Sequence, residues 1–273
     1  MSKIWFITGS SRGFGRRFAE AALSRGDKVA ATARNTDSLT DLVAAYGDAI
    51  LSLPLDVTDK AAVTGAVQQA HDRFGRLDVV VNNAGYGLFG MVEELTEDDI
   101  RAQFDTNVFG ALWVTQAVLP YLRAQGSGHI INVSSVLGVA AFPTTGAYTA
   151  SKAALEGLSD ALAQEAAAFG VKVTVVEPGA FGTDFATSST WSRPVAAYDG
   201  VREAAGAAFA SLPSPDPAGV GPALLKIADA DNPPLRVFFG TLALQLVPQL
   251  YTERLKTWQD WADVSAQSEA GQG

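Results

Sequence analysis

The sequence contains no cysteine and only two histidines, His71 and His129. Without cysteine, disulfides, zinc–thiolate sites and thiol catalysis are excluded. A histidine-based metal site or a Ser-His-Asp relay would need one of the two histidines, and neither lies near a suitable motif. We therefore expect no metal centre, and any chemistry must come from other side chains.

Long apolar runs and an excess of basic residues are also missing. No stretch of about 20 apolar residues is present, and the N-terminus lacks the parts of a signal peptide. Lys and Arg total 20 against 29 Asp and Glu, a formal net charge of −9 that repels phosphodiester backbones. These absences predict a cytoplasmic protein that binds neither membranes nor nucleic acid.

What the chain does contain is apolar sequence arranged in alternating short and long segments. Hydrophobic residues make up 48% and charged residues 18% of the 273, enough for a large buried core. The predicted strands are residues 3–8, 28–33, 50–54, 77–81, 129–133, 171–176 and, more weakly, 235–239. The predicted helices are residues 13–25, 38–46, 60–74, about 96–123 and 146–169. Strand–helix alternation implies parallel pairing with right-handed crossovers. The predicted fold class is α/β, a Rossmann-type doubly wound parallel sheet of about seven strands with helices on both faces.

No internal boundary divides this sheet, so we expect a single domain over residues 1–273. Residues 180–230 have a looser pattern that is typical of a substrate-binding loop with helices. Apolar residues at helical spacing predict an amphipathic C-terminal helix over about 249–264, and residues 265–273 are expected to be a frayed tail. Trp258 and Trp261 in this region would close the substrate pocket or meet another subunit.

Tyr148 and Lys152 lie four residues apart in a predicted helix, so their side chains share one face. A phenol keeps its proton until a pH of about 10, and a nearby ammonium favours the phenolate. Ser134 and Ser135, a short way upstream, offer a hydroxyl for a substrate oxygen. Together these groups predict a proton donor and acceptor for a carbonyl or alcohol, provided that another group carries the hydride. For each group alone, an exposed helical pair or a strand-end serine is the commoner explanation.

A glycine-rich segment, residues 8–15, joins the first predicted strand to the first helix. Glycines there let the backbone approach a pyrophosphate, which then lies against helix N–H groups. The spacing is Gly-x-x-x-Gly-x-Gly rather than the general Gly-x-Gly-x-x-Gly, and a tight turn that needs glycine is the alternative. Strand, loop and helix in this order favour a dinucleotide cofactor.

The end of the second strand indicates which dinucleotide is bound. NAD-preferring folds commonly place an acid here for the ribose hydroxyls, whereas an arginine accommodates the 2′-phosphate of NADP. Ala33 stands where the acid would be, Arg34 follows, and Arg12 in the glycine-rich segment is a second phosphate partner. We favour NADP(H), with NAD(H) as the alternative. The less specific explanation is that both arginines are solvated surface residues.

Two further strand ends carry polar residues. Asp56, followed by Val57, would accept a hydrogen bond from an adenine amino group or would cap the next helix. Residues 82–85, Asn-Asn-Ala-Gly, suit a backbone that passes close to a cofactor, or form an Asx turn. Both pairs of alternatives remain open on these residues alone.

Six motifs therefore occur in order along the chain: Thr8-Gly9-x-x-x-Gly13-x-Gly15, Asn82-Asn83-Ala84-Gly85, Asn107, Ser135, Tyr148-x-x-x-Lys152 and Pro178-Gly179-x-x-x-Thr183. In this order and position on the sheet, they make the chain resemble the short-chain dehydrogenase/reductase family in its single-domain form. The resemblance covers roughly residues 3–185, with a weaker seventh strand.

The resemblance implies an NAD(P)-dependent carbonyl reductase or alcohol dehydrogenase with four catalytic residues. Tyr148 would be the general acid in reduction and the base in oxidation. Lys152 would lower the pKa of that tyrosine and hold the nicotinamide ribose. Ser135, rather than Ser134, would polarise the substrate oxygen, and Asn107 would hold a water in the proton relay. The implied cofactor-binding residues are Gly9, Ser11, Arg12, Gly13, Phe14, Gly15, Arg34, Asp56, Val57, Asn83, Ala84, Gly85, Tyr148, Lys152, Pro178, Gly179 and Thr183.

The substrate side depends on apolar and aromatic residues in loops at the same sheet edge: Tyr86, Leu88, Phe89, Leu137, Phe142, Phe181, Phe185, Trp191 and Tyr198. They predict an apolar small-molecule carbonyl or alcohol substrate, although core packing or an interface explains each one separately. The resemblance also implies a homo-oligomer, a dimer or tetramer, formed through the two long helices. The alternatives are a non-catalytic NADP-binding sensor, or enoyl reduction, epimerisation or dehydration on the same scaffold.

Overall fold

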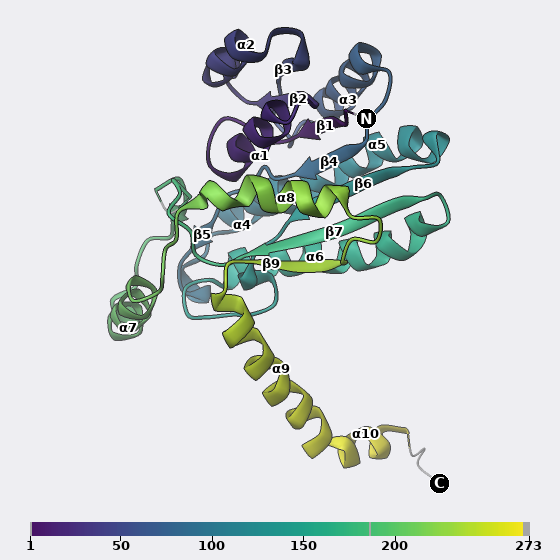
Figure 1. Cartoon of the computed structure of the whole chain (residues 1–273). Coiled ribbons are helices and arrows are strands. Elements are labelled where there is room, and N and C mark those ends of the chain that lie inside the picture. Colours follow the sequence, from purple (N-terminus) through teal and green to yellow (C-terminus); the bar gives the residue numbers. More distant parts are fainter. Residues whose placement is uncertain (1, 186, 270–273) are drawn as a thin grey trace.

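The computed structural model describes residues 2–185 and 187–269, and its centre is a seven-stranded parallel sheet (Figure 1). The strand order is β3-β2-β1-β4-β6-β7-β9. The strands are β1 (Ile4–Ile7), β2 (Lys28–Ala33), β3 (Ile50–Pro54), β4 (Val79–Asn82), β6 (Gly128–Val133), β7 (Val171–Pro178) and β9 (Arg236–Phe239). The order reverses between β1 and β4, the point at which such sheets bind ligands beyond their carboxyl ends. The predicted doubly wound α/β fold, including its weaker seventh strand, is confirmed.

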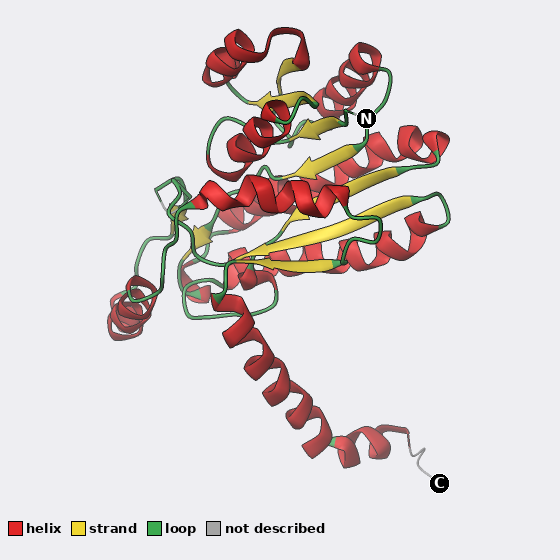
Figure 2. Cartoon of the chain, viewed as in Figure 1, coloured by secondary structure: helices red, strands yellow, loops and turns green. Residues whose placement is uncertain are grey.

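Helices cover both faces of the sheet (Figure 2). One face carries α1 (Gly13–Ser24), α2 (Thr40–Tyr46) and α8 (Val220–Asp229), and the other carries α3 (Lys60–Phe74), α5 (Ala111–Gln125) and α6 (Gly146–Ala167). Strand β1 shows why the strands are apolar throughout. Trp5 and Ile7 pack into the core on the first face, and Ile4 and Phe6 pack into the core on the second. Alternate side chains of a strand point to opposite faces, so a sheet covered on both sides needs apolar residues at every position.

The predicted substrate-binding region, residues 180–230, divides into two parts with different surroundings. Helix α8 packs on α1 as part of the core, and a Cβ on Gly221 would lie only 2.8 Å from the Ala21 Cβ. The preceding elements, β8 (Thr190–Trp191) and α7 (Asp199–Ala210), lie instead near the carboxyl edge of the sheet (Figure 1). Only this first part is placed to contact a substrate.

The predicted continuous helix over about 96–123 is wrong in its middle. Helix α4 (Glu97–Phe104) begins as expected at Thr96, whose Oγ1 accepts a hydrogen bond from the Asp99 N–H at 3.2 Å. A π-helical turn, η4 (Asp105–Gly110), then separates α4 from α5. Single π turns inside helices frequently occur at functional sites, and this one contains Asn107.

The C-terminal segment differs most from its prediction. Helix α9 (Leu242–Asp260) begins seven residues before the expected 249–264 helix, and α10 (Ala262–Glu269) is helical where residues 265–273 were expected to fray; residues 270–273 lie outside the described part. Beyond Val247 no described residue of α9 or α10 is buried, and the helix leaves the domain (Figure 1). Trp258 and Trp261 are each 63% exposed, so they do not close the pocket of their own chain. Within residues 2–185 and 187–269, no helix is both long and apolar enough to cross a membrane.

Candidate active site at the carboxyl edge of the sheet

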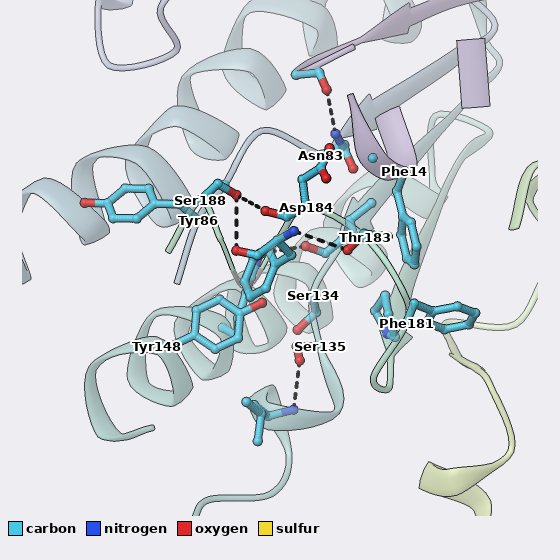
Figure 3. A pocket seen from close by; sticks show the side chains of 18 of the residues that line it. Phe14, Asn83, Tyr86, Ser134, Ser135, Tyr148, Phe181, Thr183, Asp184 and Ser188 are labelled. Carbon is cyan, nitrogen blue, oxygen red and sulfur yellow. Dashed lines mark hydrogen bonds between the residues drawn. The ribbon is translucent and has the colours of Figure 1, made fainter. Parts of the chain in front are cut away.

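A cleft of about 1170 Å³ opens beyond the carboxyl ends of the strands (Figure 3). It is lined by nearly all of the predicted site residues: Gly9, Ser11, Arg12, Gly13, Phe14, Arg34, Asp56, Val57, Asn83, Ala84, Gly85, Ser135, Tyr148, Lys152, Pro178, Gly179 and Thr183. Gly15 and Asn107 are the two predicted residues that do not line it, because both lie one layer behind the wall. The topology therefore brings residues from six strand ends into one place.

The glycine-rich loop between β1 and α1 is held by Thr8 and Asn83. The Asn83 Nδ2 donates to the carbonyl oxygens of Thr8 at 3.0 Å and Gly9 at 3.1 Å. The Thr8 Oγ1 in turn accepts from the backbone N–H groups of Asn83 and Ala84, both at 3.0 Å. The Asn83 Nδ2 thus fixes the loop, while the residue still lines the cleft. Gly15 is part of the same contact, since a Cβ there would lie 2.3 Å from the Gly9 oxygen.

The start of α1 has the features that a pyrophosphate needs. Arg12 precedes the helix in extended conformation, and its side chain makes no capping hydrogen bond to the first turn. Gly9 and Gly13 have φ angles of +67° and +56°, in the left-handed region that favours glycine. The first N–H groups of α1 are therefore free for an anion at the positive end of the helix dipole, which fits a dinucleotide.

Asp56 is held in place by its own turn. Its Oδ1 accepts from the Thr58 backbone N–H at 3.0 Å and from the Thr58 hydroxyl at 2.8 Å. These hydrogen bonds, with a smaller contribution from the charge of Arg34, hold the pKa of Asp56 below its usual range. The N-cap of α3 is Asp59, so Asp56 does not cap that helix. The helix cap is thus excluded, and a contact of Asp56 with an adenine amino group stays a prediction.

Arg12 and Arg34 line the cleft together with Ala33, as the sequence predicted. Among residues 2–185 and 187–269, neither arginine forms a salt bridge, whereas Arg16 pairs with Glu20 and Asp41. Two guanidinium groups that line one cleft and form no ion pair among these residues are suited to bind a phosphate.

Helix α6 presents Tyr148 and Lys152 to the cleft, and each is 5% exposed. The Lys152 Nζ donates to the carbonyl oxygen of Val133 at 2.8 Å and lies 5.8 Å from the centre of the Tyr148 ring. Burial lowers the pKa of Lys152 to about 8, and the charge of Glu156 opposes that effect. The ammonium is thus fixed by a backbone carbonyl from the end of β6.

The sequence predicts that Lys152 lowers the pKa of Tyr148, whereas in the structure this pKa is raised. Burial raises the pKa of Tyr148 above that of an ordinary phenol, and the nearby Ser135 hydroxyl only partly opposes this. The loss of hydration of the phenolate outweighs the attraction of the ammonium at this separation. A lowering of the Tyr148 pKa by Lys152 stays a prediction.

Ser135 is the second residue after β6 and is 7% exposed. Its Oγ accepts a hydrogen bond from the Leu137 N–H at 3.1 Å, which orients the hydroxyl and leaves its proton free to donate. Figure 3 shows Ser134 and Ser135 together on the side of the Tyr148 hydroxyl. The Ser134 Oγ lies near Gly138, since a Cβ there would be 2.7 Å away. This arrangement agrees with the choice of Ser135.

Asn107 is 1% exposed, and its side-chain amide forms three hydrogen bonds. Its Nδ2 donates to the Tyr86 carbonyl at 2.9 Å and to the Ser151 hydroxyl at 3.0 Å, and its Oδ1 accepts from the Tyr86 N–H at 3.1 Å. A Cβ on Gly85 would lie 3.0 Å from the Asn107 Oδ1 and 3.5 Å from the Lys152 Nζ, so both side chains meet the same backbone. Because both amide protons are used, a water at this place would need the free lone pair of Oδ1 or a main-chain carbonyl.

The predicted substrate residues separate into two groups. The cleft is lined by Tyr86, Leu137, Phe142, Phe181 and Phe185, and is not lined by Leu88, Phe89, Trp191 and Tyr198. The reason is the short pairing of β5 (Leu88–Phe89) with β8, which turns Leu88 into the core and leaves Trp191 60% exposed. Phe89 still packs against Tyr148, with ring centres 5.8 Å apart.

Sequence reasoning missed the far wall of the cleft. It is formed by residues on and after α7 and at the start of α9: Ala205, Ala208, Phe209, Leu212, Leu242 and Leu246. Phe209 meets Phe142 edge-on at 6.3 Å between ring centres. The apolar spacing of residues 205, 209 and 212 is the one signal in the sequence that pointed to this wall.

A second feature that the sequence did not reveal is the anchor of α7. The Glu94 carboxylate is buried and accepts from the N–H groups of Met91 and Val195, both at 2.8 Å, and it pairs with Arg202 on α7 at 2.5 Å. These contacts, with the Arg202 bond as the largest cause, lower the pKa of Glu94 to about 2. The segment over the cleft is therefore tied to the body of the domain by a buried ion pair.

Comparisons with known proteins agree with this site. The sequence model of the family described as short chain dehydrogenase matches residues 3–193. The oxidoreductase BOA17 of Botryotinia fuckeliana is 43% identical over 98% of this chain and 100% of its own length. A 3-ketodihydrosphingosine reductase of Bacteroides thetaiotaomicron is 37% identical over 94% of this chain and 93% of its own.

Solved structures show the same fold over nearly the whole chain. A short-chain dehydrogenase from Streptomyces avermitilis is 40% identical, has a TM-score of 0.92, and is matched over 99% of this chain and 100% of its own. A structure from Burkholderia phymatum in complex with NAD is 25% identical, with a TM-score of 0.82, over 94% of this chain and 95% of its own. A structure from Burkholderia cenocepacia in complex with NADP is 26% identical, with a TM-score of 0.75, over 95% of this chain and 97% of its own. The chain belongs to the short-chain dehydrogenase/reductase family and is an oxidoreductase of that family.

Proposed function

We propose that this chain is an NADP(H)-dependent oxidoreductase that acts on the carbonyl or secondary alcohol of an apolar small molecule. The observation that carries the proposal is the meeting of Ser135, Tyr148 and Lys152 on the wall of a cleft that also contains an uncapped helix N-terminus. The nicotinamide, when bound, supplies or accepts the hydride. The relatives of known structure with NAD or NADP support this cofactor class.

The protein side chains handle the oxygen and its proton. During reduction, negative charge develops on the substrate oxygen, and the hydroxyls of Ser135 and Tyr148 donate hydrogen bonds to it without reorganising. Tyr148 gives its proton to that oxygen, and in the oxidation direction it takes the proton back. The Lys152 ammonium stabilises the phenolate that forms, and its bond to the Val133 carbonyl keeps it in reach. Asn107 supports this wall through its hydrogen bonds to the Tyr86 backbone.

The apolar far wall supports the substrate class. Leucine, alanine and phenylalanine side chains from α7 and α9 face the opening of the cleft beside Tyr148. A mostly apolar pocket with few convergent polar groups favours a hydrophobic or aromatic ketone. One relative is a reductase of a ketone, 3-ketodihydrosphingosine, by its name.

The competing functions make different demands on the same residues. A non-catalytic NADP sensor has no need for Ser135, Tyr148 and Lys152, which are all present in the cleft. Enoyl reductases of the family tend to space the tyrosine and lysine more widely than here. Epimerisation and dehydration stay as alternatives of the same scaffold.

We also propose that the protein is a cytoplasmic homo-oligomer, a dimer or tetramer, that pairs through α5 and α6. Ala150, Ala153 and Ala161 of α6 are exposed and would allow close helix approach.

The proposed reaction is tested by incubating the purified protein with NADPH and a panel of aliphatic and aromatic ketones, and following absorbance at 340 nm. We expect substrate-dependent oxidation of NADPH with at least some of the apolar ketones. Binding of NADPH, followed by its fluorescence, without turnover of any ketone or oxidation of any alcohol would favour the sensor instead.

The cofactor preference is a separate prediction carried by Arg34. Arg34→Ala is expected to lower kcat/KM for NADPH about 10- to 100-fold, since a hydrogen bond to a charged group is worth about 1.5–3 kcal/mol. The value for NADH should stay unchanged, because NADH lacks the 2′-phosphate. Arg17→Ala is the matched control: Arg17 lies on the outer side of α1, with its side chain 50% exposed and paired with Glu20. A wild-type kcat/KM that is higher with NADH than with NADPH would contradict the preference.

A further inference from the structure

A cluster of charged side chains from α6, β7 and β9 lies outside the cleft. The Arg236 Nε lies 3.1 Å from the Glu156 Oε2 and 3.5 Å from the Glu177 Oε1, and the Arg236 Nη2 lies 2.6 Å from the Asp160 Oδ2. Glu156 is 5% and Glu177 1% exposed. Three carboxyl groups from two elements thus share one guanidinium from the edge strand β9.

Glu156 connects this cluster to the active site. It lies one helical turn after Lys152 on α6, so the two side chains are neighbours on one face. A Cβ on Gly138 would lie 2.7 Å from the Ser134 Oγ and 3.3 Å from the Glu156 Oε1, which places that oxygen beside the serine pair at the end of β6. Among the described residues, the Glu156 Oε1 has no hydrogen-bond partner.

A buried carboxylate such as Glu156 lowers folding stability unless its charge interacts favourably with another group. Burying a charge is unfavourable even when it is paired, and a neutral side chain of similar volume often serves structure equally well. Two neutral groups lie close to Lys152: Tyr148 on α6, whose ring centre is 5.8 Å from the Nζ, and Asn107 in η4, whose Oδ1 meets the same Gly85 backbone. Glu156, one helical turn further on, carries a charge that opposes the effect of burial on the pKa of Lys152.

We propose that Glu156 is a positioning residue that acts on the reaction through Lys152: its carboxylate keeps the neighbouring ammonium charged inside the buried wall, and Arg236 keeps Glu156 ionised. The proposal rests on the proposed function, in which Lys152 works as a cation. It adds a fifth residue to the four predicted catalytic residues, one placed outside the cleft.

The charge balance of the cluster agrees with this assignment. Burial lowers the pKa of Lys152 to about 8, close to working pH, and the Glu156 charge is what opposes it. Burial raises the pKa of Glu177 to about 7, and the charge of Glu156 raises it further. Burial raises the pKa of Glu156 as well, and the charge of Arg236 opposes that effect. Arg236 thus favours the ionised form of Glu156.

The direct test is an NMR titration of the full chain labelled with ¹³C at the lysine Cε, with the Lys152 signal assigned by its loss in Lys152→Arg. The wild-type midpoint is expected near pH 8. In Glu156→Gln, which keeps the shape and removes the charge, it should lie about one pH unit lower, as a lost opposite charge at close range implies. Glu156→Asp should restore most of the difference. Equal midpoints in wild type and Glu156→Gln would overturn the proposal.

The control is Asp160→Asn, which removes a carboxylate from the same helix and the same arginine. Asp160 lies two turns from Lys152 and its side chain is 43% exposed, so the Lys152 midpoint should not move. A shift as large as that of Glu156→Gln would show a general charge effect and overturn the proposal. If Glu156→Gln does not fold, the protonation state of Glu156 is measured instead in the wild type labelled with ¹³C at the glutamate carboxyls. A Glu156 carboxyl that is protonated at pH 8 would overturn the proposal.

Turnover provides the second readout, with NADPH and a ketone that reacts. In Glu156→Gln, kcat should be about tenfold lower at pH 9 and nearly unchanged at pH 6, with KM for the ketone unaffected, because the protonated fraction of Lys152 falls one pH unit earlier. If no ketone reacts, the proposed function fails while the titration still decides the Glu156–Lys152 interaction. If ketones react and neither readout moves, the inference alone fails.

Discussion

Replacing Tyr148 with phenylalanine is expected to reduce kcat for ketone reduction about 10²- to 10⁴-fold, the contribution of a positioned general acid. The substitution removes one oxygen and keeps the ring, whose centre lies 5.8 Å from that of Phe89 and 5.5 Å from that of Phe185. The fold and the cleft should therefore be preserved. The measurement is kcat with NADPH, together with the dissociation constant of NADPH from fluorescence.

The matched control for this change is Tyr198→Phe. Tyr198 donates to a Glu93 oxygen outside the cleft at 2.6 Å, so its loss removes the same atom without touching the chemistry. We expect NADPH affinity to be unchanged in both variants and turnover to be lost in Tyr148→Phe alone. Retention of wild-type kcat by Tyr148→Phe would remove Tyr148 from the reaction and reopen the alternatives on this scaffold.

Replacing Gly15 with alanine is expected to cost about 1–3 kcal/mol of folding stability, as overpacking of a close contact does, and to weaken NADPH binding at least about tenfold. The added Cβ would lie 2.3 Å from the Gly9 oxygen and 2.4 Å from the Asn83 Nδ2. These two atoms form the hydrogen bond that fixes the glycine-rich loop. The loop must move, and with it the N–H groups at the start of α1. Urea unfolding and fluorescence titration measure the two effects.

Gly65→Ala is the control for the same change of residue. Gly65 lies inside α3, where a Cβ meets no heavy atom within 4 Å. Alanine there should raise stability by about 1 kcal/mol, because glycine is a poor helix former. The two glycine-to-alanine changes are thus expected to have opposite signs. If Gly15→Ala is neutral for both stability and NADPH binding, the close contact does not hold the loop.

The position of Lys152 shows how the cleft depends on groups outside it. Its backbone partner is Val133 on β6, and the residue proposed to keep it charged is Glu156, whose own partner Arg236 begins β9. The edge strand of the sheet is therefore connected to the proton-transfer site through one arginine and one glutamate. A change at Arg236 far from the substrate is expected to be felt first in the pH dependence of turnover.

The chemistry-bearing motifs could be predicted from the sequence because each is local. A glycine-rich turn between a strand and a helix, or Tyr148 and Lys152 one turn apart, follows from backbone geometry over a few residues. The order of strands and helices likewise determined the doubly wound sheet, since parallel strands need crossovers of one hand. The meeting of Ser135 with Tyr148 at one sheet edge followed from that topology.

Only the tertiary structure decided the features that depend on distant contacts. Whether Asn83 contacts a ligand or fixes the loop depends on Thr8, far away in the chain. The π turn at Asn107 ends at Gly110, which packs so closely on Val57 that a Cβ would lie 2.6 Å from a methyl group. Leu246 lines the cleft while Trp258 on the same helix is exposed, because α9 leaves the domain after its first turns.

Burial is the physical reason for this division. Residue spacing states which side chains share a face, but not how much water each one loses on folding. Tyr148 and Lys152 were paired by spacing, yet the direction of their pKa shifts follows from desolvation. The same holds for Glu156 and Glu177, two ordinary glutamates in the sequence that the packing of α6, β7 and β9 turns into a buried pair around Arg236.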